Sequence, residues 1–285
     1  MIKTSMDVLS QFAPEAAGRC VADIFEYTRT LSKKPPKDVA PLGARFFPIE
    51  GTAGVTRGYQ WGTAGRSVLL VHGWGSDSRT MYSFARSFVS AGFSVATFDA
   101  PAHGVSPGNV TTLMCFKNAI RDVIISLGNV VAVVAHSIGA ITSMGAIQEL
   151  AGRHRIGAIC LFAPPVSLPV VIERWSRGKF SDRVVNHLNA ELWRRNGVPV
   201  QHWDMTTLGK DVRIPVLVMH DPADPVVPLC DSEIIVGALP HALLEKVPEA
   251  GRHLGILSNA YVIERACRFV IEQTGRPVPM EAPTA

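Results

Sequence analysis

The sequence is poor in charged residues, which make up 18% of its 285 positions, and it has no long run of lysines or arginines. Its formal net charge of +4 is spread over the whole length. Nucleic-acid-binding proteins usually concentrate basic residues on one face or in one segment, so we expect no nucleic-acid partner. Because 47% of the residues are hydrophobic, most of the chain also lies outside the composition range of disordered proteins.

Long uninterrupted hydrophobic runs are also missing. The most apolar stretch, residues 156–172, is interrupted by Pro164, Pro165 and Pro169 and falls short of the roughly 20 residues of a membrane-spanning helix. Near the N-terminus, Asp7 and Gln11 interrupt what would be the apolar core of a secretory signal. We therefore expect no membrane span and no export signal.

Cysteines are few, and their spacing suggests neither disulfides nor a metal site. There are five, an odd number, without a C-x-x-C pair. The nine histidines likewise show no pair in a metal-ligand context. We expect a disulfide-free cytoplasmic protein with no metal and no cofactor, whereas the composition leaves the oligomeric state open.

Short apolar runs alternate with segments of helical length through most of the chain. Runs of this kind, buried on both faces and separated by helices, are typical of a parallel sheet covered by helices on both sides. Two weaker alternating runs predict an antiparallel edge hairpin, and a further run predicts the last strand. The predicted strands are 67–71, 94–98, 130–135, 158–163, 215–219, the hairpin 45–49 and 55–61, and 243–247; the predicted helices are 79–91, 112–127, 138–150, 229–239 and 259–274.

The segment before the first predicted strand carries apolar residues at helical spacing from Ala17 to Leu31, with Pro14 before them. We expect one amphipathic helix that packs against the main body and ends at the Lys- and Pro-rich residues 33–37. The predicted organisation is this helix and a linker over 1–40, a main domain over 41–274, and a loose tail over 275–285.

Residues 166–212 break the alternation, because they contain helical patterns but no strand candidate. We interpret them as a small helical cap inserted over one end of the sheet. Its basic residues could attract an anionic substrate, but a solvated surface is the simpler explanation. These bases are Arg174, Arg177, Lys179, Arg183, Arg194 and Arg195.

Ser137 lies in Ala135-His136-Ser137-Ile138-Gly139, where a predicted strand meets a predicted helix. A sharp strand-to-helix turn can present a nucleophile if the flanking residues are small, as Ala135 and Gly139 are. The helix N-terminus would stabilise a developing anion beside the hydroxyl. A serine at such a turn is also an ordinary helix cap, so the turn alone does not establish catalysis.

Four further motifs accompany the Ser137 turn in a fixed order along the chain. They are His72-Gly73-Trp74-Gly75, Asp99-Ala100-Pro101-Ala102-His103-Gly104-Val105-Ser106, His220-Asp221-Pro222-Ala223-Asp224-Pro225-Val226-Val227-Pro228 and Gly251-Arg252-His253-Leu254. Over approximately residues 45–274 this set resembles the α/β-hydrolase family, in particular compact bacterial serine hydrolases with an Ala-His-Ser-x-Gly-Ala elbow and an N-terminal helical extension. The resemblance implies a mostly parallel eight-stranded sheet; its one departure is Ala135, where the usual residue is Gly.

The order Ser137, Asp, His253 is the one that the hydrolase pattern requires. A serine hydroxyl needs a base whose pKa lies near neutral pH, such as an imidazole. His253 is the candidate, because it lies in a Gly-containing loop after the last predicted strand. Asp221 and Asp224 compete for the third role. The resemblance favours Asp224, whereas Asp221 is expected to cap the turn at the strand end. The histidines in the other motif turns, His72, His103, His136 and His220, are expected to pack locally or bond to backbone.

The resemblance assigns the oxyanion hole to the backbone N–H groups of Trp74 and Ile138. Three tryptophans are candidates for the substrate pocket: Trp74 beside the oxyanion turn, and Trp175 and Trp193 in the helical insertion. The two insertion tryptophans suggest an apolar acyl group as a hypothesis.

A Ser-His-Asp set fits hydrolysis of a small-molecule acyl ester or thioester through an acyl-enzyme. Haloalkane dehalogenases and epoxide hydrolases of this family would need a carboxylate where Ser137 stands. The same residues could also serve a carbon–carbon bond hydrolase, a perhydrolase or a hydroxynitrile lyase, because a fold does not decide a function. A protein that binds a ligand without turnover is a further alternative.

Overall fold

The computed structural model describes residues 2–28, 40–41, 43–51, 54–55, 57–63 and 65–276. Within these residues, eight strands form one sheet in the order β1-β2-β4-β3-β5-β6-β7-β8. The strands from β3 to β8 are parallel, whereas β2 pairs antiparallel with β1 and β4. The strands are β1 Arg45–Pro48, β2 Arg57–Trp61, β3 Ser67–Val71, β4 Ser94–Thr97, β5 Val130–His136, β6 Ala158–Phe162, β7 Val216–His220 and β8 Ala242–Lys246.

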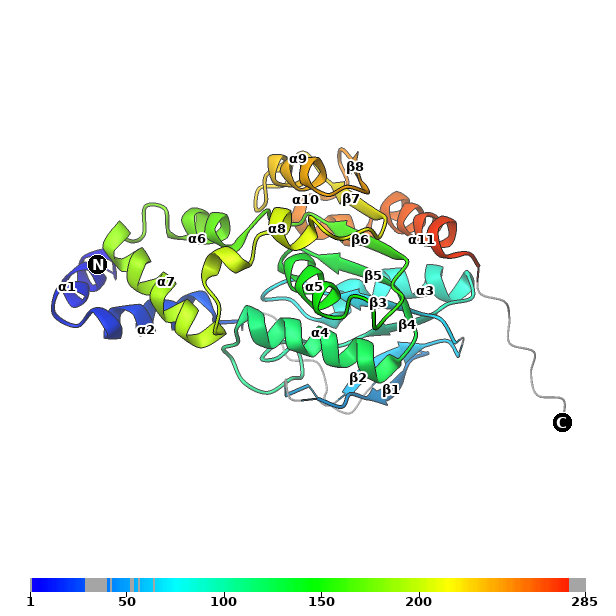
Figure 1. Cartoon of the computed structure of the whole chain (residues 1–285), viewed down its shortest axis with the longest axis horizontal. Coiled ribbons are helices and arrows are strands. Elements are labelled where there is room, and N and C mark those ends of the chain that lie inside the picture. Colours follow the sequence, from blue (N-terminus) through cyan, green and yellow to red (C-terminus); the bar gives the residue numbers. More distant parts are fainter. Residues whose placement is uncertain are drawn as a thin grey trace, which may run out of the picture.

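Each predicted strand matches an observed strand to within two residues at either end, and the antiparallel edge hairpin is present. The central strands carry Val, Leu and Ile on both faces because helices cover both faces (Figure 1). In β3, Leu69 and Val71 face the side that holds α4 and α5, while Val68 and Leu70 face α3 and α11. The fold class expected from the sequence is confirmed.

The helices connect the strands in chain order, and none of those in the described residues is long and apolar enough to cross a membrane. Their bounds are α1 Ile2–Phe12, α2 Pro14–Phe25, α3 Tyr82–Ser90, α4 Leu113–Leu127, α5 Ile138–Glu149, α6 Leu168–Ser176, α7 Asp182–Asn196, α8 Met205–Gly209, α9 Leu229–Ala238, α10 Arg252–Gly255 and α11 Ala260–Thr274, with 3₁₀ turns at Ser78–Met81, Val200–His202 and Ile256–Ser258.

The N-terminal segment differs from the single expected helix. Two helices are present, and they meet at Ala13, whose φ of −144° is not helical. Pro14 causes the break, because proline suits the first position of a helix but restricts the residue before it. Leu31, the Lys- and Pro-rich residues 33–37 and the tail from residue 277 lie outside the described residues.

Residues 166–212, all of them described, hold α6, α7 and α8 and no strand. Figure 1 shows α6 and α7 beside α1 and α2, away from the main body of the sheet. We call α1, α2, α6 and α7 the helical lobe. Helices α2 and α7 approach each other closely at Gly18, where an added Cβ would lie 2.7 Å from the carbonyl oxygen of His187. The N-terminal segment therefore packs largely on the insertion.

Candidate active site

Ser137 stands at the turn between β5 and α5, with φ 52° and ψ −128°. A non-glycine residue adopts this conformation only where the surroundings enforce it, and such strain is common at functional sites. Glycines let neighbouring backbone approach this turn closely. A Cβ on Gly139 would lie 2.3 Å from the His72 carbonyl oxygen, and one on Gly73 would lie 3.1 Å from the Cβ of Ser137. The strand, the helix and the loop after β3 thus meet closely around one hydroxyl.

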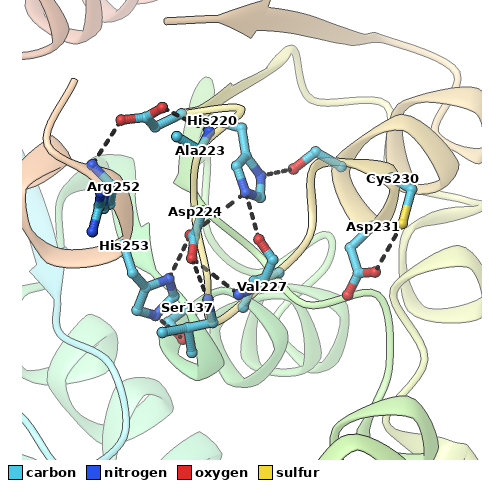
Figure 2. A network of polar contacts seen from close by, with 12 residues as sticks. Ser137, His220, Ala223, Asp224, Val227, Cys230, Asp231, Arg252 and His253 are labelled. Atoms are coloured by element: carbon cyan, nitrogen blue, oxygen red, sulfur yellow. Dashed lines mark hydrogen bonds and ion pairs between the residues drawn. The ribbon is translucent and has the colours of Figure 1, made fainter. Parts of the chain in front are cut away.

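His253 joins this hydroxyl to a carboxylate (Figure 2). Its Nε2 lies 3.1 Å from the Oγ of Ser137, and its Nδ1 lies 2.7 Å from Oδ2 of Asp224. Ser137 follows β5, Asp224 follows β7 and His253 begins after β8, so the carboxyl ends of three parallel strands bring them together. The structure thus brings together the three side chains that the sequence nominated.

Asp224 lies in a site that keeps it ionised. Burial alone would raise the pKa of this carboxyl group. The hydrogen bonds from His220, His253 and the N–H of Val226 outweigh burial and hold the pKa well below its usual range. Oδ1 accepts from the N–H groups of Val226 and Val227, at 2.7 and 3.0 Å. Oδ2 is therefore left to face the imidazole of His253.

Asp221, the competing carboxylate, does not contact His253 in this arrangement. Its Oδ1 accepts from the N–H of Ala223 at 2.9 Å, and its Oδ2 accepts from the N–H of Arg252 at 2.7 Å. Burial would raise the pKa of Asp221, but hydrogen bonds from four backbone N–H groups outweigh burial. The pKa therefore lies below its usual value. Asp221 thus fixes the backbone immediately before His253.

Two buried histidines brace the loop after β3. His72 donates from Nδ1 to the Gly73 carbonyl at 2.7 Å and accepts at Nε2 from the N–H of Ala100 at 3.0 Å. Burial lowers the pKa of His72, which keeps the ring neutral for this double role. His103 accepts from the N–H of Gly75 at 3.1 Å. Among the described residues, no hydrogen bond occupies the N–H of Trp74 or of Ile138, the two predicted oxyanion donors.

His136 supports His253 from the side. Its Nε2 donates to the backbone carbonyl of His253 at 2.8 Å, and the two rings lie 4.7 Å apart. Burial and the neighbouring His253 lower the pKa of His136 to about 3, so this ring stays neutral. The sequence indicated a local backbone bond for His136, but not that the bond spans 117 positions to reach His253.

A cavity of about 1230 Å³ opens over Ser137 and His253. Of the three predicted pocket tryptophans, Trp74 and Trp175 line it. Trp193 does not, and the prediction for this residue is wrong: it lies on α7 with 57% of its surface exposed. Leu192 is the neighbour that α7 buries, and the next helical position points about 100° away.

Nothing in the sequence analysis indicated that the N-terminal segment reaches the cavity. Ile24, Phe25 and Tyr27 line it together with Leu168 and Val171 of α6. The amphipathic pattern of α2 was visible, but a pattern of this kind does not identify the surface against which the helix packs. No group of three or more potential metal ligands is found among the described residues.

A family model described as serine aminopeptidase, S33, matches residues 62–202. Among curated proteins, none matches the chain. Many solved structures do. Est1E from Butyrivibrio proteoclasticus, solved with ferulic acid bound, superposes with a TM-score of 0.65 at 17% identity, covering 82% of this chain and 100% of its own.

Two further solved structures are similar over most of the chain. The esterase Pf2001 from Pyrococcus furiosus has a TM-score of 0.63 and 15% identity, with 87% of this chain and 99% of that chain covered. A bromoperoxidase from Bacillus anthracis has a TM-score of 0.58 and 18% identity, with 80% and 99% covered. At these identities the superpositions describe the fold.

Proposed function

We propose that this protein, whose chain has the α/β-hydrolase fold, is a serine hydrolase that cleaves carboxylic esters through an acyl-enzyme on Ser137. The observation that carries the proposal is the continuous contact from Ser137 through His253 to Asp224, at 3.1 and 2.7 Å, on the floor of a cavity. The esterases among its structural neighbours support the same reaction class.

In this mechanism the Oγ of Ser137 attacks the ester carbonyl while Nε2 of His253 takes the hydroxyl proton. Asp224 holds the ring and stabilises the imidazolium. The N–H groups of Trp74 and Ile138 donate hydrogen bonds to the carbonyl oxygen and stabilise the negative charge that develops on it. His253 then protonates the departing alcohol, and a water molecule activated by the same ring releases the acid and restores Ser137.

The cavity favours an ester over the amino-terminal peptide suggested by the description of the family model. Recognition of a free ammonium group needs an available carboxylate. Among the described residues that line the cavity, Asp77 is the only acid, and both its oxygens bind Arg79, at 2.7–2.9 Å. Thioesters meet the same triad in the same way, so a thioester belongs in the test.

The test is turnover of p-nitrophenyl esters from acetyl to decanoyl, and of a matching thioester, with a fluorophosphonate probe. We expect wild-type protein to cleave the esters and to be labelled, and Ser137→Ala to lose both. Ser143→Ala is the matched control, because Ser143 is buried in α5, the helix that follows Ser137, and its hydroxyl has no partner among the described residues. Folded wild-type protein that is not labelled would contradict the proposal and favour ligand binding without turnover.

A further inference from the structure

The end of α2 and the residues after it form part of the cavity wall, although they precede the sheet in the sequence. Ile24, Phe25 and Tyr27 line the cavity. The ring of Phe25 packs edge-to-face on Trp175 of α6, with the ring centres 5.0 Å apart. Trp175 in turn packs on Phe180 at 5.3 Å. The N-terminal segment and the insertion therefore share one aromatic cluster at the cavity.

This wall is attached to α7 by a buried contact between a carboxyl group and an arginine. Glu26 is 1% exposed, and its Oε2 binds Nη1 of Arg195 in α7 at 2.9 Å. Arg195 also binds Asp23, one turn earlier in α2, and Glu191 within α7, each at 2.8 Å. One arginine thus ties the end of α2 to α7 and leaves little freedom to the residues between these contacts.

The same wall is attached to the main domain by backbone bonds. Thr28 donates from its N–H to the carbonyl of Asn109 at 2.9 Å and from its hydroxyl to the carbonyl of Ala102 at 2.7 Å. Tyr27 and Val110 form an isolated antiparallel bridge. The segment around Phe25 is therefore fixed on both sides, to α7 and to the loop after β4, as a rigid wall requires.

Most of the side chains that line the cavity away from the reacting centre are apolar. Exposed apolar side chains line it from both directions: Ile24 and Tyr27 from the N-terminal segment, Val226 beside Asp224, and Leu254 beside His253, each 49–59% exposed. Removing apolar surface of this kind from water stabilises the complex with an apolar ligand.

The arginines that line the cavity already bind carboxylates. Arg174 binds both oxygens of Asp231, at 2.6 and 2.7 Å. Arg177 binds Glu173 at 2.6 Å, and Arg79 binds Asp77 as described above. These carboxylates already offset much of the positive charge of the three arginines, so the lining offers little net attraction to a second charged group on the substrate.

We propose that Ile24, Phe25 and Tyr27 form a specificity-determining wall that selects esters carrying a large apolar group, such as a medium-length acyl chain. This inference rests on the proposed ester hydrolysis at Ser137. It assigns to the N-terminal segment a role in choosing the substrate, in addition to its packing on α7.

The experiment compares kcat/KM for acetyl and decanoyl p-nitrophenyl esters in wild type, Phe25→Ala and Phe25→Leu. We expect Phe25→Ala to lower the decanoyl-to-acetyl ratio about tenfold or more, since a lost apolar contact in a pocket costs on this order. Acetyl turnover should be retained, and Phe25→Leu should restore much of the ratio. Phe12→Ala is the matched control, because Phe12 lies on α1, is 83% exposed and does not line the cavity.

A binding measurement separates this inference from the proposed function. Decanoic acid is titrated into Ser137→Ala protein with and without Phe25→Ala, and we expect the second substitution to weaken binding about tenfold or more. Esters that are cleaved with an unchanged or uniformly lowered ratio would overturn the wall while leaving the hydrolase. Phe25-dependent binding of decanoic acid by a protein that cleaves no ester would do the reverse.

Discussion

The strand-end turns and the helical lobe hold their cavity residues by different kinds of contact. Around Ser137 the contacts involve backbone: His72, His136 and Asp221 each bind a main-chain group within 3.0 Å. In the lobe, ring packing and ion pairs between side chains predominate, as between Phe25 and Trp175. A main-chain partner remains when its own side chain is substituted, whereas a side-chain partner does not.

The difference suggests a division of labour. A turn that is braced through the main chain keeps the same geometry for any substrate, which suits the chemical step. A wall built from packed side chains can be reshaped without moving the nucleophile. We therefore expect substitutions in the turns to affect all esters equally, and substitutions in the lobe to affect the choice among them.

The largest expected effect separates the two aspartates within the turns. Asp224→Asn should lower kcat by about 10⁴-fold on every ester, because the amide can no longer hold His253 in the required tautomer. Asp221→Asn should lower kcat much less and act mainly through stability, since Asp221 binds only backbone N–H groups. Steady-state kinetics and thermal unfolding of both proteins measure this. Equal losses of kcat in folded proteins would contradict the assignment.

Gly139→Ala tests the turns through the backbone. The new Cβ would lie 2.3 Å from the carbonyl oxygen of His72, so the strand, helix or loop must shift. We expect the free energy of unfolding to fall by about 1–3 kcal/mol and turnover of acetyl and decanoyl esters to fall together. Denaturant titration and the two rates check this. A selective loss of decanoyl turnover would argue against the division of labour.

Gly18→Ala is the corresponding change in the lobe. Its Cβ would lie 2.7 Å from the carbonyl oxygen of His187, so α2 must move relative to α7. We expect the decanoyl-to-acetyl ratio to change severalfold while acetyl turnover is kept. Gly237→Ala is the control: its Cβ meets nothing within 4 Å, and the replacement in α9 should stabilise the protein by about 0.5–1 kcal/mol.

The smallest effect on turnover is expected from the pH-dependent contact that attaches the end of α2 to α7. Burial raises the pKa of Glu26 from its ordinary value of 4.5 to about 7, although its bonds to Arg195 act in the opposite direction. The folded protein thus binds more protons than the unfolded chain between these pH values. The free energy of unfolding should accordingly fall as the pH rises through this window.

Glu26→Gln should flatten this part of the pH profile, measured by denaturant unfolding between pH 4.5 and 7. Glu15→Gln provides the control within α2, because the Glu15 side chain is 90% exposed. A profile of Glu26→Gln with the wild-type slope would show that another group titrates in this range.

The turns were largely predictable from the sequence, whereas the lobe was not. Short motifs place Ser137, Asp224 and His253 at the ends of buried strands, and parallel strands bring such ends together without further information. The packing of α2 on α7 depends on the fit of two amphipathic helices far apart in sequence. Local periodicity shows that each has an apolar face, but it does not show which surface covers that face.

The same limit explains Trp193 and the N-terminal break. The helical pattern of α7 was visible, but its packing on α2 decides which side chains are buried, and no α7 side chain in the described part of the chain lines the cavity. Ala13 and Pro14 marked a helix start, but helix α1 before them was not predicted, although its apolar residues recur at helical spacing. Tertiary packing decides these features, and the sequence expresses it only through distant partners.

The close approach of Gly18 to His187 also has a consequence for the order of synthesis. Ribosomes extend a chain from its N-terminus, so α2 emerges long before α7, which begins at Asp182. A helix of 12 residues is marginally stable on its own in water. The residues that line the cavity at the end of α2 thus remain without their partner until α7 has been made.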